Sequence, residues 1–168
     1  MSDVFLGLGS NDGNREDNIK RALVLLENDK GIKIKAASSL YETKALGESL
    51  QPDFVNCVVK IKTDYEPRDL LKIAKSVEKT LGREPHTHML PRTMDIDILL
   101  YDNIDLDSLE LRIPHSRLHM RRFVLEPLLE IDKNIRHPIT NELLSDCLEK
   151  VKSQKMMKIM DSSEVWNE

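Results

Sequence analysis

The residues with the clearest chemical potential are two aspartates, Asp95 and Asp97, inside the apolar run 94–101. Side chains alternate between the two faces of a strand, so both carboxylates lie on one face, ~7 Å apart at their Cα atoms. Oxygen ligands at this spacing suit one or two hard cations such as Mg²⁺, which binds few carboxylates and shares substrate phosphates. The alternative is a polar strand face open to water, as we expect for Asp105 and Asp107, which have the same spacing.

Basic residues accompany this pair. Arg92 precedes Asp95 by three residues, in a loop that also holds His86 and His88, and Arg83 is a further candidate cation. Acidic ligands for a metal beside a base for phosphate are typical of phosphoryl transfer.

A second basic cluster covers residues 112–122, which contain no acidic residue although the chain has a net charge of −4. Arginine forks match phosphate oxygens in bidentate pairs, so this segment indicates a polyphosphate pocket. For Arg117 and Arg122 we favour the simpler interpretation of a solvated turn. His115 and His119 have the spacing of a helical zinc pair, but no cysteine or second histidine pair at matching spacing completes such a site.

Glycines follow the first apolar run, at Gly7, Gly9 and Gly13. Three residues separate Gly9 from Gly13, whereas the dinucleotide-binding fingerprint requires two, and no phosphate-binding loop of the Gly-x-x-x-x-Gly-Lys type is present. We therefore interpret Gly9 and Gly13 as parts of a tight turn between a strand and a helix.

Hydrophobic periodicity predicts the elements that position these residues. The order strand, helix, strand, strand, helix, strand is the split βαβ pattern of an α+β, ferredoxin-like βαββαβ core with a C-terminal elaboration. The predicted core strands are 4–8, 32–42, 54–62 and 94–101, and the predicted core helices are 14–28 and 67–81. The elaboration has possible short strands at 104–106 and 109–113, helices near 123–130 and 142–152, and a loose tail from about 161.

Length and composition set the class of protein. The 168 residues, with 40% hydrophobic and 32% charged residues, predict a single globular domain spanning 1–168. Two scattered cysteines form no disulfide framework and fit a reducing cytoplasm. The first residues do not have the pattern of a signal peptide, no apolar stretch approaches a membrane span, and the negative net charge argues against nucleic acid as a partner.

Several short motifs, in this order and spacing, resemble the 6-hydroxymethyl-7,8-dihydropterin pyrophosphokinase family over roughly residues 4–148. They are Gly9-Ser10-Asn11, Ser39-x-Tyr41-x-Thr43, Gln51-Pro52-Asp53-Phe54-x-Asn56, Glu78-x-x-x-Gly82-Arg83, Pro91-Arg92-Thr93-Met94-Asp95-Ile96-Asp97-Ile98, Pro114-His115 and Arg121-x-Phe123. The resemblance implies transfer of pyrophosphate from ATP to the hydroxymethyl group of the pterin, with release of AMP, in folate biosynthesis. It also implies two Mg²⁺ ions on Asp95 and Asp97.

The resemblance implies roles for further residues. Cations that contact ATP phosphates or stabilise the transition state would be Arg83, Arg92, His115 and Arg121. Glu78 and Ile98 would belong to the nucleotide pocket. The pterin ring would lie between Phe54 and Phe123, and its edge would contact Thr43, Leu46 and Asn56.

The sequence departs from the family pattern mainly between Gly82 and Arg92, where the loop is about one residue short and lacks the usual tryptophan. Lys44 and Ala45 also replace a proline-rich stretch beside the pterin site. These departures leave a non-catalytic module that binds pterin and nucleotide as the alternative, while an RNA-binding sheet is disfavoured by the net charge. We expect a monomer that acts on small-molecule substrates.

Overall fold

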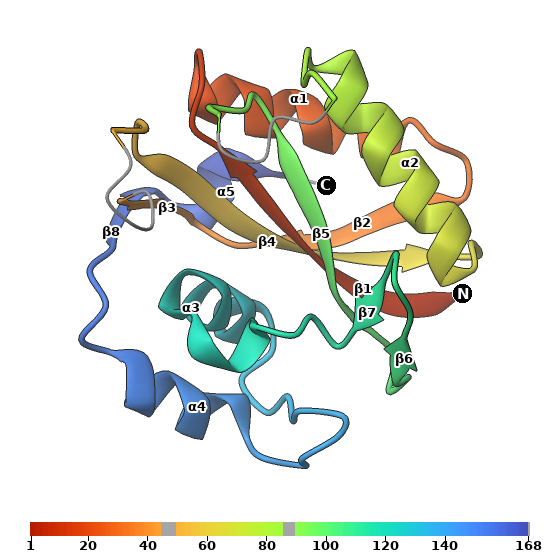
Figure 1. Ribbon diagram of the computed structural model, residues 1–168, viewed down its shortest axis with the longest axis vertical. Coiled ribbons are helices and arrows are strands. Elements are labelled where there is room, and N and C mark those ends of the chain that lie inside the picture. The colour runs from red at the N-terminus through yellow and green to blue at the C-terminus, as the bar shows by residue number, and fades with distance from the viewer. Residues whose placement is uncertain (45–49, 86–89, 168) are drawn as a thin grey trace.

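A computed structural model describes residues 1–44, 50–85 and 90–167 (Figure 1). A short 3₁₀ helix spans Leu118–Met120. The strands are β1 Ser2–Ser10, β2 Ile32–Ala37, β3 Leu40–Thr43, β4 Phe54–Thr63, β5 Asp95–Tyr101, β6 Leu106–Asp107, β7 Arg112–Ile113 and β8 Met157–Met160. The helices are α1 Arg15–Glu27, α2 Pro67–Thr80, α3 Arg122–Ile131, α4 Leu144–Val151 and α5 Ser162–Val165.

The central element is a six-stranded antiparallel sheet in the order β5-β1-β4-β3-β8, in which β2 also pairs with β4. The strands of the predicted βαββαβ core are β1, β2, β4 and β5, and their spatial order is β5-β1-β4-β2. The α+β, ferredoxin-like fold class predicted from the sequence is therefore confirmed.

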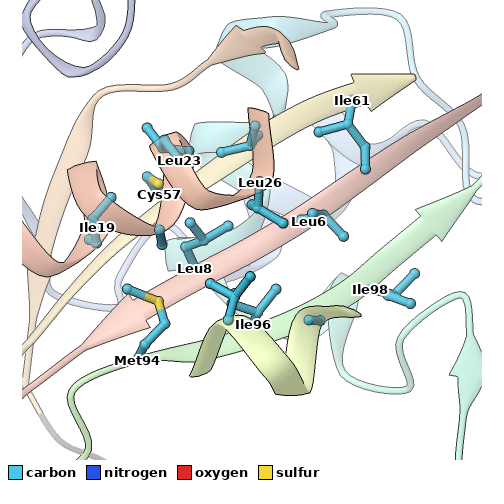
Figure 2. Packing of buried hydrophobic residues seen from close by; sticks show 14 of the residues in the cluster. Leu6, Leu8, Ile19, Leu23, Leu26, Cys57, Ile61, Met94, Ile96 and Ile98 are labelled. Carbon is cyan, nitrogen blue, oxygen red and sulfur yellow. The ribbon is translucent and has the colours of Figure 1, made fainter. Parts of the chain in front are cut away.

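Helices cover both faces of this sheet: α1 and α2 lie on one face, and α3 and α4 lie on the other (Figure 1). Alternation along β1 divides its side chains between two hydrophobic cores. Leu6 and Leu8 pack with α1 and α2, whereas Phe5 packs on the α3 side with Leu99. Figure 2 shows the first of these cores. β1 and β5 are thus held from both sides, so residues at their ends have fixed positions.

The two core helices begin and end where the sequence predicts. The side chain of Asn14 caps α1 by accepting a hydrogen bond from the Asp17 N–H. Pro67 occupies the first turn of α2, and Gly82 follows its end with φ of 92°, a conformation that favours glycine. Arg83 therefore follows directly after the end of this helix.

The predicted strand over 32–42 is instead two strands, β2 and β3. Ser38 interrupts it, because its hydroxyl donates to the Ser39 carbonyl and accepts from the Val58 N–H. Such side-chain bonds to the backbone compete with a regular ladder.

The tail was expected to be loose from about 161, but residues 161–165 are ordered. β8 pairs with β3, and α5 begins with a capping box in which Asp161 and Glu164 each bond the other's backbone. Val165 is buried in the first core, and the Ser162 N–H donates to Ser39 Oγ. The Asp-x-x-Glu spacing was the readable signal for this turn. No helix among the described residues is long and apolar enough to cross a membrane.

Candidate active site

Most of the predicted site residues line one cavity of ≈ 230 Å³ on the α3 side of the sheet. Its floor is formed by β1, β4 and β5, and the start of α3 forms a wall. The predicted residues that line it are Thr43, Phe54, Asn56, Arg92, Asp95, Asp97, His115, Arg121 and Phe123. The cavity therefore joins the predicted metal, phosphate and pterin groups in one space.

The carboxylate pair lies on one face of β5, as the alternation predicts. Opposite it in β1, Gly9 pairs with Asp95 and Gly7 pairs with Asp97. Since neither glycine carries a side chain, β1 leaves space over the sheet beside both acids. By contrast, Asp107 faces solvent and pairs with Arg112, so the shared spacing alone did not distinguish the two pairs.

Cations are distributed unequally over the two acids. Arg83 Nη1 lies 2.8 Å from Asp95 Oδ1, and Arg92 Nη1 lies 3.3 Å from Asp95 Oδ2. Among the described residues, the nearest basic group to Asp97 is His115, whose Nε2 lies 4.0 Å from Oδ2. Asp95 is thus balanced by two guanidinium groups, while Asp97 has no ion pair of comparable length among the described residues.

This imbalance changes the acidity of the site. Burial, and then the neighbouring Asp95 charge, raise the pKa of Asp97 to about 7, although 45% of its side chain remains accessible. Burial and the charge of Arg121 lower the pKa of His115. The Arg117 N–H donates to His115 Nδ1, which leaves the other nitrogen, Nε2, to carry the proton of the neutral ring toward Asp97.

A divalent cation fits this arrangement. Two like charges on one strand face, one of them poorly compensated, are stabilised when a cation lies between them. In the described part of the chain, no three histidine, cysteine, aspartate or glutamate side chains converge on a metal-sized space. An ion held by only two carboxylates, with water and substrate oxygens as the other ligands, is typical of Mg²⁺.

The zinc pair considered from the sequence is not formed. His115 lines the cavity, whereas His119 packs edge-on against His137, with ring centroids 5.9 Å apart. The two histidines therefore lie in different environments and do not form a metal-binding pair with each other.

Aromatic and amide side chains also line the cavity. Arg92 lies over the Phe54 ring, 5.9 Å from its centroid, and Arg121 lies over Phe123 at 5.4 Å. Nearby, the side chain of buried Asn56 donates a 2.9 Å hydrogen bond to Thr43 Oγ1. Flat apolar faces next to an amide suit a planar heterocycle with a polar edge.

With this geometry in place, a family model decides the class of protein. Residues 5–133 match 7,8-dihydro-6-hydroxymethylpterin-pyrophosphokinase (HPPK). The chain belongs to this family. The resemblance inferred from the motifs, and with it the pyrophosphokinase class, is confirmed, and a module without catalysis is not favoured.

Curated relatives agree. The chain is 42% identical over 146 residues to an Aquifex aeolicus 2-amino-4-hydroxy-6-hydroxymethyldihydropteridine pyrophosphokinase, covering 87% of this chain and 90% of the relative. The Bacillus subtilis protein of the same name is 37% identical over 138 residues, covering 82% and 83%. Folic acid synthesis protein fol1 of Schizosaccharomyces pombe is 39% identical over 151 residues, but the chain spans only 21% of its length.

Solved structures show the same fold. A crystal structure of HPPK-DHPS in complex with substrates superposes with a TM-score of 0.70 at 16% identity, covering 89% of this chain and 43% of that one. A Plasmodium falciparum HPPK-DHPS gives a TM-score of 0.69 at 17% identity, with 89% and 45% covered. The chain therefore spans less than half of these longer proteins.

Two residues assigned to the nucleotide pocket of this HPPK-family chain do not line the cavity. Ile98 points to the opposite face of β5 and packs in the first core (Figure 2). Glu78 is buried, accepts a 2.8 Å hydrogen bond from the Ile96 N–H, and lies 3.0 Å from Arg83 Nη1. Glu78 thus holds Arg83 toward Asp95, and contact of Glu78 or Ile98 with a nucleotide stays a prediction.

Leu46, the remaining predicted pterin contact, and His86 and His88 of the loop before Arg92 are outside the described residues.

Sequence reasoning missed the role of Asn11. Its side chain accepts from the Arg92 N–H at 2.8 Å and donates to Gln51 Oε1 and the Pro52 carbonyl, both at 3.2 Å. A buried amide directly after a strand was the signal, since buried polar groups are almost always bonded. The interpretation of Gly9 as a turn residue was also wrong, because Gly9 lies inside β1 and forms part of the cavity floor.

Proposed function

We propose that this chain transfers the pyrophosphoryl group of ATP to the hydroxymethyl oxygen of 6-hydroxymethyl-7,8-dihydropterin, with release of AMP, in folate biosynthesis. The observation that carries the proposal is that one cavity joins the Asp95 and Asp97 carboxylates to the faces of Phe54 and Phe123. The carboxylates and guanidinium groups would supply a polyphosphate and metal environment, and the aromatic rings would supply a seat for a planar ring.

Asp95 and Asp97 would hold two Mg²⁺ ions, which when bound neutralise charge on the polyphosphate. Arg92 and Arg121 both line the cavity, so their guanidinium groups can bind phosphate oxygens and keep the β-phosphorus in line with the acceptor. Arg83 and His115 add donors beside the two acids. The new bond joins the pterin oxygen to the β-phosphorus, the bond from that phosphorus to the AMP oxygen breaks, and the hydroxyl proton of the pterin is released to water.

Pterin recognition would use the aromatic end. Phe54 and Phe123 offer two flat faces, and Asn56 offers an acceptor and a donor to the polar edge of the ring. Thr43, bonded to the Asn56 amide, fixes which way that amide points. Leu46 is proposed to complete this edge.

The protein is further proposed to act as a monomeric single domain, residues 1–168, in the cytoplasm. Both cysteines, Cys57 and Cys147, are free and buried, which supports a reducing compartment. One sheet connects β1 to β8, which supports a single domain.

The direct test is to incubate the protein with ATP, Mg²⁺ and the hydroxymethyl dihydropterin and to separate the nucleotides by chromatography. We expect AMP in equal amount to the pterin pyrophosphate formed, and none after EDTA is added. Formation of ADP, or tight binding of both substrates without turnover, would overturn the proposal.

Gly9→Ala should weaken pterin binding. A Cβ at Gly9 would lie 2.9 Å from Asn56 Oδ1, so the amide must shift, which disturbs the hydrogen bond that it donates to Thr43. We expect the KM for the pterin to rise by about 10-fold, equivalent to about 1.4 kcal/mol, with the KM for ATP changed less.

The matched control is Gly7→Ala, on the same face of the same strand. Its added Cβ would meet only the flexible end of Leu99, at 3.3 Å, so we expect a smaller effect. Equal rises in KM for the two variants would contradict a specific role of the Asn56 amide.

A further inference from the structure

A second, wider hollow adjoins the active-site cavity, with a volume of ≈ 590 Å³. We call it the basic groove, and Thr43, Lys44, Arg121 and Phe123 line both it and the cavity. The residues that line only the basic groove are Arg117, Met120, Arg122, Gln154, Lys155 and Met156. Several of these lie beyond residue 133, where the family match ends.

The charges in this groove are of one sign. Lys44, Arg117, Arg121 and Lys155 come from three separate parts of the chain, and none of the described residues that line the groove with them is acidic. Within the described residues, none of these four forms an ion pair. Such cations repel one another unless an anion lies between them.

The wall that carries Lys155 is fixed in place. Arg122 Nη1 donates to the carbonyls of Lys152 and Gln154, at 3.2 and 2.7 Å. The Gln154 side chain accepts from the Arg122 N–H and donates to the Met120 carbonyl, both at 2.9 Å. Arg122 is thus structural rather than a solvated turn residue, and it holds the 152–156 segment against the start of α3.

The start of α3 adds to the positive field. Helix N-termini carry partial positive charge and usually have acidic residues in the first turn. Here the capping position is Arg121, no side chain caps the helix, and the first turn has no acid. Burial, and then the like charge of Arg117, lower the pKa of Arg121, as expected of like charges that are held close together.

We propose that the basic groove is a second anion site, which binds a phosphate or pyrophosphate group separately from the polyphosphate at the carboxylates. Arg117 and Lys155 bind the group from two separate segments of the chain, and Lys44 adds a cation where the groove adjoins the cavity. Phe123, Met120 and Met156 give the groove an apolar part, so the group can be free or part of an ester. This site does not depend on the proposed reaction.

The test uses isothermal titration calorimetry with inorganic pyrophosphate as the probe. The protein is first saturated with α,β-methylene-ATP and Mg²⁺, which fills the site at the carboxylates. We expect one further equivalent of pyrophosphate to bind, more weakly as salt is added. Absence of binding to the saturated protein would overturn the proposal.

Variants locate the binding. Arg117→Glu combined with Lys155→Glu should weaken pyrophosphate binding by at least 10-fold. The neutral pair Arg117→Gln and Lys155→Gln should weaken it by a smaller factor, and it keeps the test valid if charge reversal disturbs folding. The control with the same change in net charge combines Lys33→Glu and Lys133→Glu, both of which are exposed and do not line the groove. Equal affinity in the groove variants and the control would also overturn the proposal.

A second arm identifies the source of the group. If the pterin pyrophosphate product displaces the probe from the saturated protein, the groove takes the esterified group, and if it does not, the groove takes the free anion. Release of AMP is measured separately on the unmodified protein. A protein that binds pyrophosphate in the groove but releases no AMP would contradict the proposed reaction and leave the groove standing.

Discussion

Asp97→Asn is expected to abolish AMP release while making the metal-free protein more stable at pH 8. The amide removes a metal ligand, so activity should fall by more than about 10³-fold. It also removes the charge that burial and Asp95 oppose. Because 45% of the side chain is accessible, we discount the gain for solvent screening to on the order of 1 kcal/mol, or ~2–4 °C in Tm.

The gain in stability from Asp97→Asn should depend on pH. The folded-state pKa of Asp97, about 7, lies above the ordinary value of 3.8 for this side chain, so the native state favours the protonated acid. Stability from this group is therefore full below pH 4 and is lost as the pH rises through 7. The Tm difference between Asp97→Asn and the unmodified protein should be smallest at pH 4 and level off above pH 7.

Mg²⁺ should reverse the order of stability, so that the unmodified protein becomes more stable than Asp97→Asn. Binding to the native state alone stabilises the unmodified protein by mass action, and the variant gains less. Asp107→Asn is the control, since that exposed acid has the same strand spacing and should leave AMP release unchanged. Full activity of Asp97→Asn would show that the pair is only a polar strand face.

Arg92→Ala is expected to lower kcat/KM by about 10²–10³-fold, the usual cost of one lost donor to a developing charge. Arg92 lies within 3.3 Å of Asp95 and over the ring of Phe54, so it contacts both a carboxylate and an aromatic residue of the cavity. Arg92→Lys keeps the charge but not the planar fork, and it should recover only part of the loss. The measurement is AMP release under varied ATP and pterin.

The control for this prediction is Arg112→Ala. Arg112 belongs to the basic cluster at 112–122 but is exposed, pairs with Asp107 and does not line the cavity. We expect its kinetics to match those of the unmodified protein. A loss at Arg112 as large as that at Arg92 would mean that overall charge, rather than position, sets the rate.

Local patterns were sufficient for much of the fold and for part of the site. Apolar periodicity located α1 and α2, and alternation along β5 put Asp95 and Asp97 on one face. These features depend on neighbours in the sequence, so they are readable there.

Features that depend on distant partners were not readable. The pairing of β8 with β3 joins segments more than 110 residues apart, and no local pattern at 157–160 announces it. The basic groove combines Lys44 with Arg117 and Lys155, whose proximity comes only from the packing of the 152–156 segment against α3. Alternation on β5 also placed the side chain of Ile98 away from the site, which a motif match alone does not consider.

The hydrogen bonds of Asn11 have a thermodynamic consequence. One amide side chain joins the backbone of Arg92, on the phosphate side, to Gln51 and Pro52, just before the pterin side. A ligand that orders either segment therefore orders part of the other, and the second ligand loses less conformational entropy on binding. Under the proposed function, ATP and the pterin should each raise the other's affinity by the same factor, as linkage requires.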